Sequence, residues 1–153
     1  MGTGTMQLDT LKSDFELLED WEDRYRHVIE LGKDLPAFDD AARTAAHKVR
    51  GCASQVWLVP RISGPASDPV VSYAGDSDAL IVKGLIAIAF MIYSGRKARD
   101  IVTTDAAPIL RELGLNDHLT PQRSNGFAAL IERIKAEARL ALQESSATGI
   151  AGR

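Results

Sequence analysis

The apolar run from Ala79 to Tyr93 constrains the fold of this chain more than any other feature. Its one charged residue is Lys83, and on a helix its apolar side chains would cover nearly every side. The run is shorter than the roughly 20 residues that a transmembrane helix needs. Because an apolar helix of this kind must be packed on several sides, we expect it to be the buried central helix of a globular domain, with Asp76, Ser77 or Asp78 as its N-cap.

Helical spacing of apolar residues predicts further helices on both sides of this run. Residues 5–18 are expected to form the first helix, and a second should begin near Trp21, with Asp20 as its N-cap, and end at Gly32. The helices expected after the apolar run are residues 98–102, residues 106–113 and a long last helix that begins at Thr120-Pro121.

Two short segments between these helical regions have the composition of strands. Gln55–Val59, which Pro60 bounds, and Val70–Ala74 are rich in β-branched and aromatic residues. His47–Val49 is expected to supply a third strand. The order of helices, strands and helices predicts an α+β fold, in which a small antiparallel sheet of about three strands packs against several helices.

Length and charge narrow the functional classes. The 153 residues suit a single domain, which we place at residues 1–144, followed by a tail over residues 145–153 that we expect to be disordered. A net charge of −3 argues against a nucleic-acid partner, which usually requires a basic surface. The chain has one cysteine and lacks the pattern of a signal peptide, so we expect a cytoplasmic protein with no membrane attachment.

Cys52, the only cysteine, is the residue whose role the local sequence leaves most open. It follows Gly51, which permits a tight turn that would display the thiol. An ordinary cysteine with a pKa of about 8.5 is mostly protonated at neutral pH, and positive charge from Arg50, Lys48 or His47 would raise its thiolate fraction. A lone cysteine is, however, more often a small buried hydrophobic residue without chemistry.

Other uses of a cysteine have less support. A cysteine hydrolase needs a histidine base, and none of His27, His47 and His118 has a distinctive setting. The Cys-x-x-Cys pattern of thioredoxin-type proteins is absent, and one cysteine with scattered histidines is a poor set of metal ligands. From the residues alone, a nucleophile, an inert core residue and a hydrolase all stay open.

Four longer stretches carry a resemblance to a known family. They are Trp21–Tyr25 continuing to Ile29–Gly32 and Leu35-Pro36; Gly51–Leu58; Gly75–Ala79 continuing to Ile81–Leu85; and Leu119–Gly126. In these stretches the chain resembles the SufE family, the cysteine desulfuration proteins of iron–sulfur cluster assembly. The stretches occur in the family's order, and the resemblance covers the chain from about Leu8 to Leu142.

The resemblance implies a fold shared with IscU-type scaffold proteins and a function in sulfur transfer. Cys52 would accept sulfane sulfur from the persulfide of a SufS-like cysteine desulfurase, stimulate that enzyme, and deliver the sulfur to a SufBCD-like scaffold complex. Such a protein acts with the desulfurase rather than as a stand-alone enzyme, and it is expected as a monomer or weak homodimer. It needs no cofactor or metal of its own, whereas the desulfurase uses pyridoxal phosphate.

Three further residues are expected to assist Cys52. Arg50 and Arg123 would stabilise a thiolate or persulfide, or pair with carboxylates of the partner, and Gln55 would hydrogen-bond the cysteine loop. Because an exposed reactive thiol is easily oxidised, we expect Cys52 to be sheltered by apolar side chains in the free protein and to move out on docking. The alternative is a binding module that stimulates the desulfurase allosterically and carries no sulfur.

Overall fold

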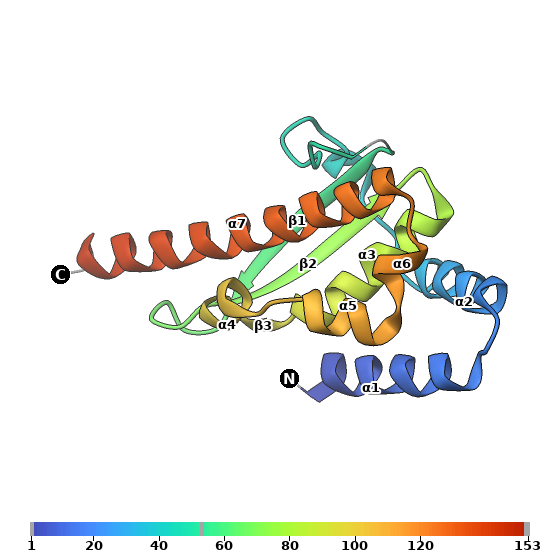
Figure 1. The fold of residues 1–153 in the computed structure, drawn as a ribbon. Coiled ribbons are helices and arrows are strands. Elements are labelled where there is room, and N and C mark those ends of the chain that lie inside the picture. The colour runs from blue at the N-terminus through green and yellow to red at the C-terminus, as the bar shows by residue number, and fades with distance from the viewer. Residues whose placement is uncertain (1, 53, 152–153) are drawn as a thin grey trace.

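The computed structural model describes residues 2–52 and 54–151, and for residues 2–6 and 145–151 it describes the backbone alone. The elements in chain order are α1 (Gly2–Leu17), α2 (Trp21–Lys33), the 3-10 turn η1 (Asp40–Ala42), β1 (Val56–Ser63), β2 (Val70–Ser77), α3 (Leu80–Tyr93), β3 (Arg96–Lys97), α4 (Ala98–Thr103), α5 (Ala107–Leu113), α6 (Leu115–His118) and α7 (Pro121–Ala151) (Figure 1). The strands form an antiparallel sheet in the order β1-β2-β3. The predicted α+β fold is therefore confirmed.

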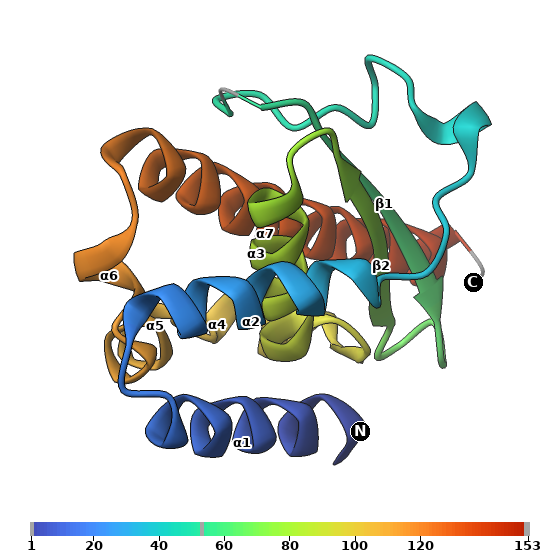
Figure 2. The same ribbon diagram turned by 90° about the vertical axis from the view of Figure 1, so that its right-hand side faces the viewer.

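Helix α3 is the buried centre of the fold, as the apolar run predicts. The side chains of Ile86, Ile88 and Tyr93 are 0% exposed. Helix α2 approaches α3 so closely that a Cβ atom at Gly84 would lie 2.1 Å from the carbonyl oxygen of Val28. Strand β2 and helices α1 and α7 pack on the other sides of α3 (Figure 2). Within the described part of the chain, no helix combines the length and the apolar character that a membrane crossing requires.

Local signals for helix ends are confirmed at two helices. Asp20 accepts a hydrogen bond from Glu22 N at 3.1 Å, and Thr120 Oγ1 accepts one from Arg123 N at 3.2 Å, so both are N-caps as predicted.

The expected cap of the third helix, α3, is wrong. Its N-cap is Ala79, which has no capping side chain. Of the three residues proposed for that cap, Asp76 pairs with Arg43, Asp78 accepts from Gln55 N, and Ser77 Oγ accepts from Ala79 N, ahead of the first helical residue.

The third strand is not the one expected. Lys48 forms only an isolated bridge with Trp57, whereas β3 pairs with β2 through Val70 opposite Lys97 and Val71 opposite Arg96. Two polar residues after the central helix have no strand pattern in the sequence.

Pro60 lies inside β1, opposite Tyr73, rather than ending the strand. Leu58 N donates away from β2, to His47 O at 2.9 Å. Because residues two apart in a strand direct their N–H groups to the same side, Pro60 also faces away from β2. Its missing N–H therefore removes nothing from the β1–β2 ladder, which is why an edge strand accepts a proline here.

Helix α7 extends to Ala151, and its last turns project beyond the sheet (Figure 1). The backbone of residues 145–151 continues this helix, and the expected division into a domain and a tail over residues 145–153 stays a prediction. Adding a residue to an existing helix is much easier than starting one, so a polar, Ala- and Ser-containing segment can continue it. The last two residues of that tail lie outside the described residues.

Candidate functional site

Cys52 lies in a short loop whose two ends are anchored. We call residues 50–54 the Cys52 loop; residue 53 lies outside the described residues. Before the loop, Val49 N donates to Val56 O at 2.8 Å, which ties the incoming segment to β1. After it, Gln55 N donates to Asp78 Oδ1 at 3.0 Å. The bonds at both ends leave the residues between them as the part that can move.

Gly51 makes the turn that presents the cysteine. Its φ of +90° lies in a region that residues with a side chain rarely adopt. The tight turn predicted from the Gly-Cys pair is therefore confirmed.

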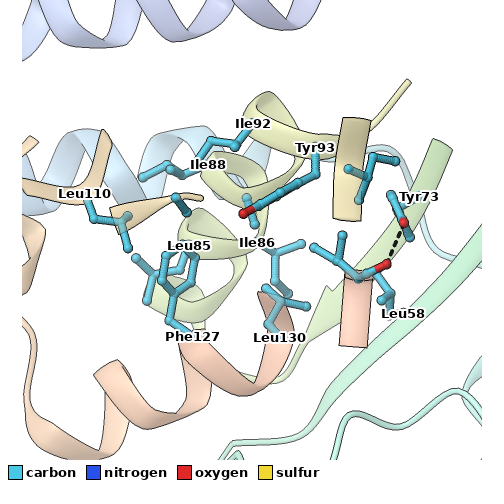
Figure 3. Packing of buried hydrophobic residues seen from close by; sticks show 14 of the residues in the cluster. Leu58, Tyr73, Leu85, Ile86, Ile88, Ile92, Tyr93, Leu110, Phe127 and Leu130 are labelled. Carbon is cyan, nitrogen blue, oxygen red and sulfur yellow. Dashed lines mark hydrogen bonds between the residues drawn. The ribbon is translucent and has the colours of Figure 1, made fainter. Parts of the chain in front are cut away.

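The Cys52 thiol faces a cavity of about 230 Å³ between the Cys52 loop, β1, α3 and the start of α7. The side chain is half-buried, and Sγ donates to the carbonyl oxygen of Gly126 at 3.4 Å. The apolar residues that line the cavity are Val56, Val82, Leu85, Phe127 and Leu130. Figure 3 shows Leu85 of α3 and Phe127 of α7 close together in the core, with Leu130 further along α7.

The surroundings of Cys52 favour the thiol rather than the thiolate. Burial raises the pKa of the Cys52 thiol above its ordinary value. Arg50 and Lys48 are exposed, and no hydrogen bond or ion pair joins either side chain to another described residue. In this conformation these basic neighbours therefore do not raise the thiolate fraction. Neither places its positive charge where it would offset the desolvation of the sulfur.

Arg123 and Cys52 line the same cavity, although they are far apart in the sequence. Arg123 lies in the first turn of α7, and its guanidinium carbon is 5.8 Å from the centre of the Tyr25 ring, within the range of a cation–π contact. Gln55 contributes its backbone to the loop anchor, while the residue is exposed. Of the three residues expected to assist Cys52, the structure brings Arg123 to the cavity, places Gln55 at the loop's end and leaves Arg50 in solvent.

A partly buried ion-pair cluster that the sequence did not reveal supports the segment before the loop. Asp76 of β2 pairs with Arg43 and with Lys83, the latter at 3.6 Å. Burial alone would raise the pKa of the Asp76 carboxyl, but bonds from Arg43 and the Ser77 backbone and the nearby positive charges outweigh it and hold that pKa below its ordinary value. The Arg43 guanidinium also lies over the Trp57 ring, at 5.7 Å. Arg43 therefore joins the loop region to the sheet.

The histidines do not supply a base for Cys52. His27 faces Asp14 at 3.4 Å, His118 stacks on Trp21, and the described residues that line the cavity include no histidine. The described residues also contain no group of three or more His, Cys, Asp or Glu side chains arranged to hold a metal ion. The arrangement offers one thiol at a cavity that has several apolar lining residues and an arginine elsewhere in its lining.

Comparison with known proteins identifies the family of this chain. A family model described as SufE, Fe-S metabolism associated domain, matches residues 9–138. A protein of Rhizobium meliloti (strain 1021), described as an uncharacterized SufE-like protein, is 52% identical over 131 residues, which cover 86% of this chain and 94% of that protein. A second uncharacterized SufE-like protein, from Rhizobium etli, is 51% identical over 133 residues, 87% of this chain and 90% of its own.

The fold also matches a solved structure. The solution structure of a hypothetical protein from Thermus thermophilus superposes with a TM-score of 0.69 and 19% identity, covering 93% of this chain and 97% of the other. At that identity the likeness concerns the fold alone. The family model and the two relatives cover most of the chain and carry the assignment: this chain belongs to the SufE family, whose domain is associated with Fe–S metabolism.

Proposed function

We propose that this protein is a sulfur acceptor and carrier, which takes sulfane sulfur onto Cys52 from the persulfide of a cysteine desulfurase and delivers it to an iron–sulfur scaffold complex. One observation carries the proposal: the only cysteine of a SufE-family chain lines a cavity of about 230 Å³ whose lining combines apolar side chains with Arg123 and other polar residues. One additional sulfur atom is comparable in size to a water molecule, which takes about 30 Å³ in the liquid. The cavity volume exceeds that space.

The chemistry is thiol exchange at sulfur. The thiolate of Cys52 attacks the outer sulfur of the donor persulfide; a bond forms between that sulfur and Sγ while the donor's S–S bond breaks. The donor cysteine leaves as a thiolate, the Cys52 proton passes to solvent or to the donor, and no external oxidant or reductant is consumed. The protein therefore needs no cofactor of its own, and pyridoxal phosphate belongs to the desulfurase.

Shelter and attack require two positions of the Cys52 loop. In the retracted position described here, burial keeps the sulfur protonated by raising its pKa, and a protonated, half-buried thiol reacts slowly with oxidants. On docking, the residues between the two anchored ends move out and the thiol loses the burial that raises its pKa. Arg50, already in solvent, pairs with partner carboxylates, and Arg123 stabilises the persulfide when it returns to the cavity.

The partners follow from the same chemistry. The donor is a SufS-like desulfurase, which the protein stimulates by removing its sulfur, and the acceptor is a SufBCD-like scaffold complex in the cytoplasm. Both contacts are transient, so the surface around Cys52 must release each partner after transfer.

Intact-mass spectrometry tests the carrier function. After incubation with a desulfurase and cysteine, the parent protein should gain the mass of one sulfur atom, and Cys52→Ser, which keeps the size of the side chain, should gain none. If the parent gains no sulfur and Cys52→Ser still stimulates the desulfurase, the protein is an allosteric binding module instead.

A further inference from the structure

The segment that leads into the Cys52 loop, residues 46–49, is held from two sides. On one side it pairs with β1. On the other, Arg133 of α7 donates from Nη1 to the carbonyl oxygen of Lys48 at 3.0 Å and from Nη2 to that of Ala46 at 2.7 Å. Residues 45–47 form a turn, and the carbonyls of residues 46 and 48 on this side face one guanidinium, which satisfies both acceptors.

The Arg133 side chain is itself held in place. Its Nε donates to Glu137 Oε2 at 3.1 Å, one turn further along α7. The Arg133 side chain is 25% exposed and that of Glu137 is 14% exposed, so both are much less mobile than a typical surface pair. Charge-assisted hydrogen bonds from a planar group fixed at three nitrogens define where the carbonyls of residues 46 and 48 lie.

The same helix also touches the tip of the loop. Gly126, two turns earlier on α7, accepts the hydrogen bond from Cys52 Sγ at 3.4 Å. A thiol is a weak donor, so this bond alone holds the tip loosely, whereas the two bonds from Arg133 hold the incoming segment firmly. The position of that segment sets where the loop begins and therefore where the thiol lies relative to the cavity.

We propose that Arg133 is a positioning residue, which fixes residues 46–49 against α7 and thereby keeps Cys52 retracted in its cavity. The positioning role does not depend on a partner protein, whereas its consequence for sulfur transfer rests on the proposed function. Removing the guanidinium frees the incoming segment on one side, so the loop opens more often and the thiol reaches solvent more often.

Alkylation of Cys52 by iodoacetamide tests the proposal, because the chain has no other cysteine to react. Arg133→Met should be labelled roughly tenfold faster than the parent, since two charge-assisted hydrogen bonds are lost. Arg133→Lys, which keeps the charge but not the fork, should be intermediate. The matched control is Arg139→Met, on the same helix at an exposed position without a hydrogen bond or ion pair to another described residue, and it should keep the parental rate.

The direction of the change separates positioning from other roles. If Arg133 acted only by its charge, its loss would disfavour the Cys52 thiolate and slow the labelling. If it acted only on global stability, the melting temperature would fall while labelling of the folded protein stayed at the parental rate. A parental or slower rate in folded Arg133→Met overturns the proposal; should that variant not fold, a parental rate in Arg133→Lys overturns it.

Labelling uses no desulfurase, so it is independent of the mass experiment above. Fast labelling of Arg133→Met in a protein that accepts no sulfur would refute the carrier function and leave the positioning role standing. Sulfur uptake by the parent together with parental labelling of Arg133→Met would refute the positioning role alone.

Discussion

The Cys52 loop and the β1–β2 hairpin that follows it are neighbours with opposite construction. The hairpin is paired along eight residues of each strand, from Val56 opposite Ser77 to Ser63 opposite Val70. It is fastened to α7 where the Tyr73 hydroxyl donates to Ile134 O at 2.7 Å (Figure 3). For the described residues of the loop, the one hydrogen bond found is that of the Cys52 thiol.

Because of this difference, the hairpin contributes to the stability of the protein, whereas the loop can move. The hairpin, with α2 and α3, forms what we call the frame, and its hydrogen bonds and buried contacts supply the free energy of folding. The loop contributes little to that sum, so its movement has little effect on the frame. Substitutions in the frame should therefore change stability, and substitutions at the loop or its supports should change the behaviour of Cys52.

The largest effect is expected where the frame is tightest. Gly84→Ala would place a methyl group 2.1 Å from the Val28 carbonyl oxygen and push α2 away from α3. We expect the free energy of unfolding to fall by about 3 kcal/mol, more than the gain in helix propensity offsets. Urea denaturation measures this loss of unfolding free energy.

Gly95→Ala is the control for this substitution. A Cβ atom there meets nothing within 4 Å, and only the φ of +80° is unfavourable, so the expected loss is about 1 kcal/mol. Equal losses of unfolding free energy in both variants would mean that the close contact between α2 and α3 does not determine the stability of the frame.

A smaller effect is expected where the frame meets the loop region. Arg43→Met removes the hydrogen bond to Asp76, whose side chain is only 13% exposed, and leaves that carboxylate with Lys83 and the Ser77 backbone. The unfolding free energy should fall by about 1–2 kcal/mol. Arg26→Met, which breaks pairs at a side chain 72% exposed, should change it by less than about 0.5 kcal/mol. Matching values for the two variants in thermal unfolding would contradict a supporting role for Arg43.

The smallest effect concerns the loop itself and depends on pH. Because burial raises the pKa of Cys52, the folded protein keeps a proton that the unfolded chain has lost between the ordinary thiol pKa and the raised one. The resulting stability is complete below this window and disappears as the pH rises through it. The parent should therefore lose stability faster than Cys52→Ala as the pH is raised above neutral, and parallel curves in urea titrations would refute the effect.

Local signals predicted the central helix and two helix N-caps. The apolar run gave α3, and Asp20 and Thr120 cap their helices as expected, because a cap depends on residues two or three positions away. The third strand was missed because Arg96 and Lys97 pair with β2 through a tertiary arrangement that two polar residues do not encode. Asp76 was mistaken for a cap because its partner, Arg43, lies far from it in the sequence.

The site was predicted only in part, because local sequence indicates contacts between near neighbours and not between distant residues. Gly51 indicated the turn from its own residue type, whereas the role of Cys52 as a nucleophile rests on the resemblance to the SufE family and stays a prediction. Arg50 was expected at the thiol because it is near in sequence, yet it is in solvent. Gly126 and Arg133 come from α7, and only the folded chain brings them to the loop.

Pro60 has a further consequence for how this protein meets other chains. The outer edge of β1 is covered at its start by residues 47–49, and at Pro60 it lacks the N–H that an added strand would require. A foreign strand therefore finds no continuous row of donors along β1. Under the proposed function the Cys52 loop opens beside that edge, and the missing donor at Pro60 then disfavours sheet-to-sheet self-association while the loop is away.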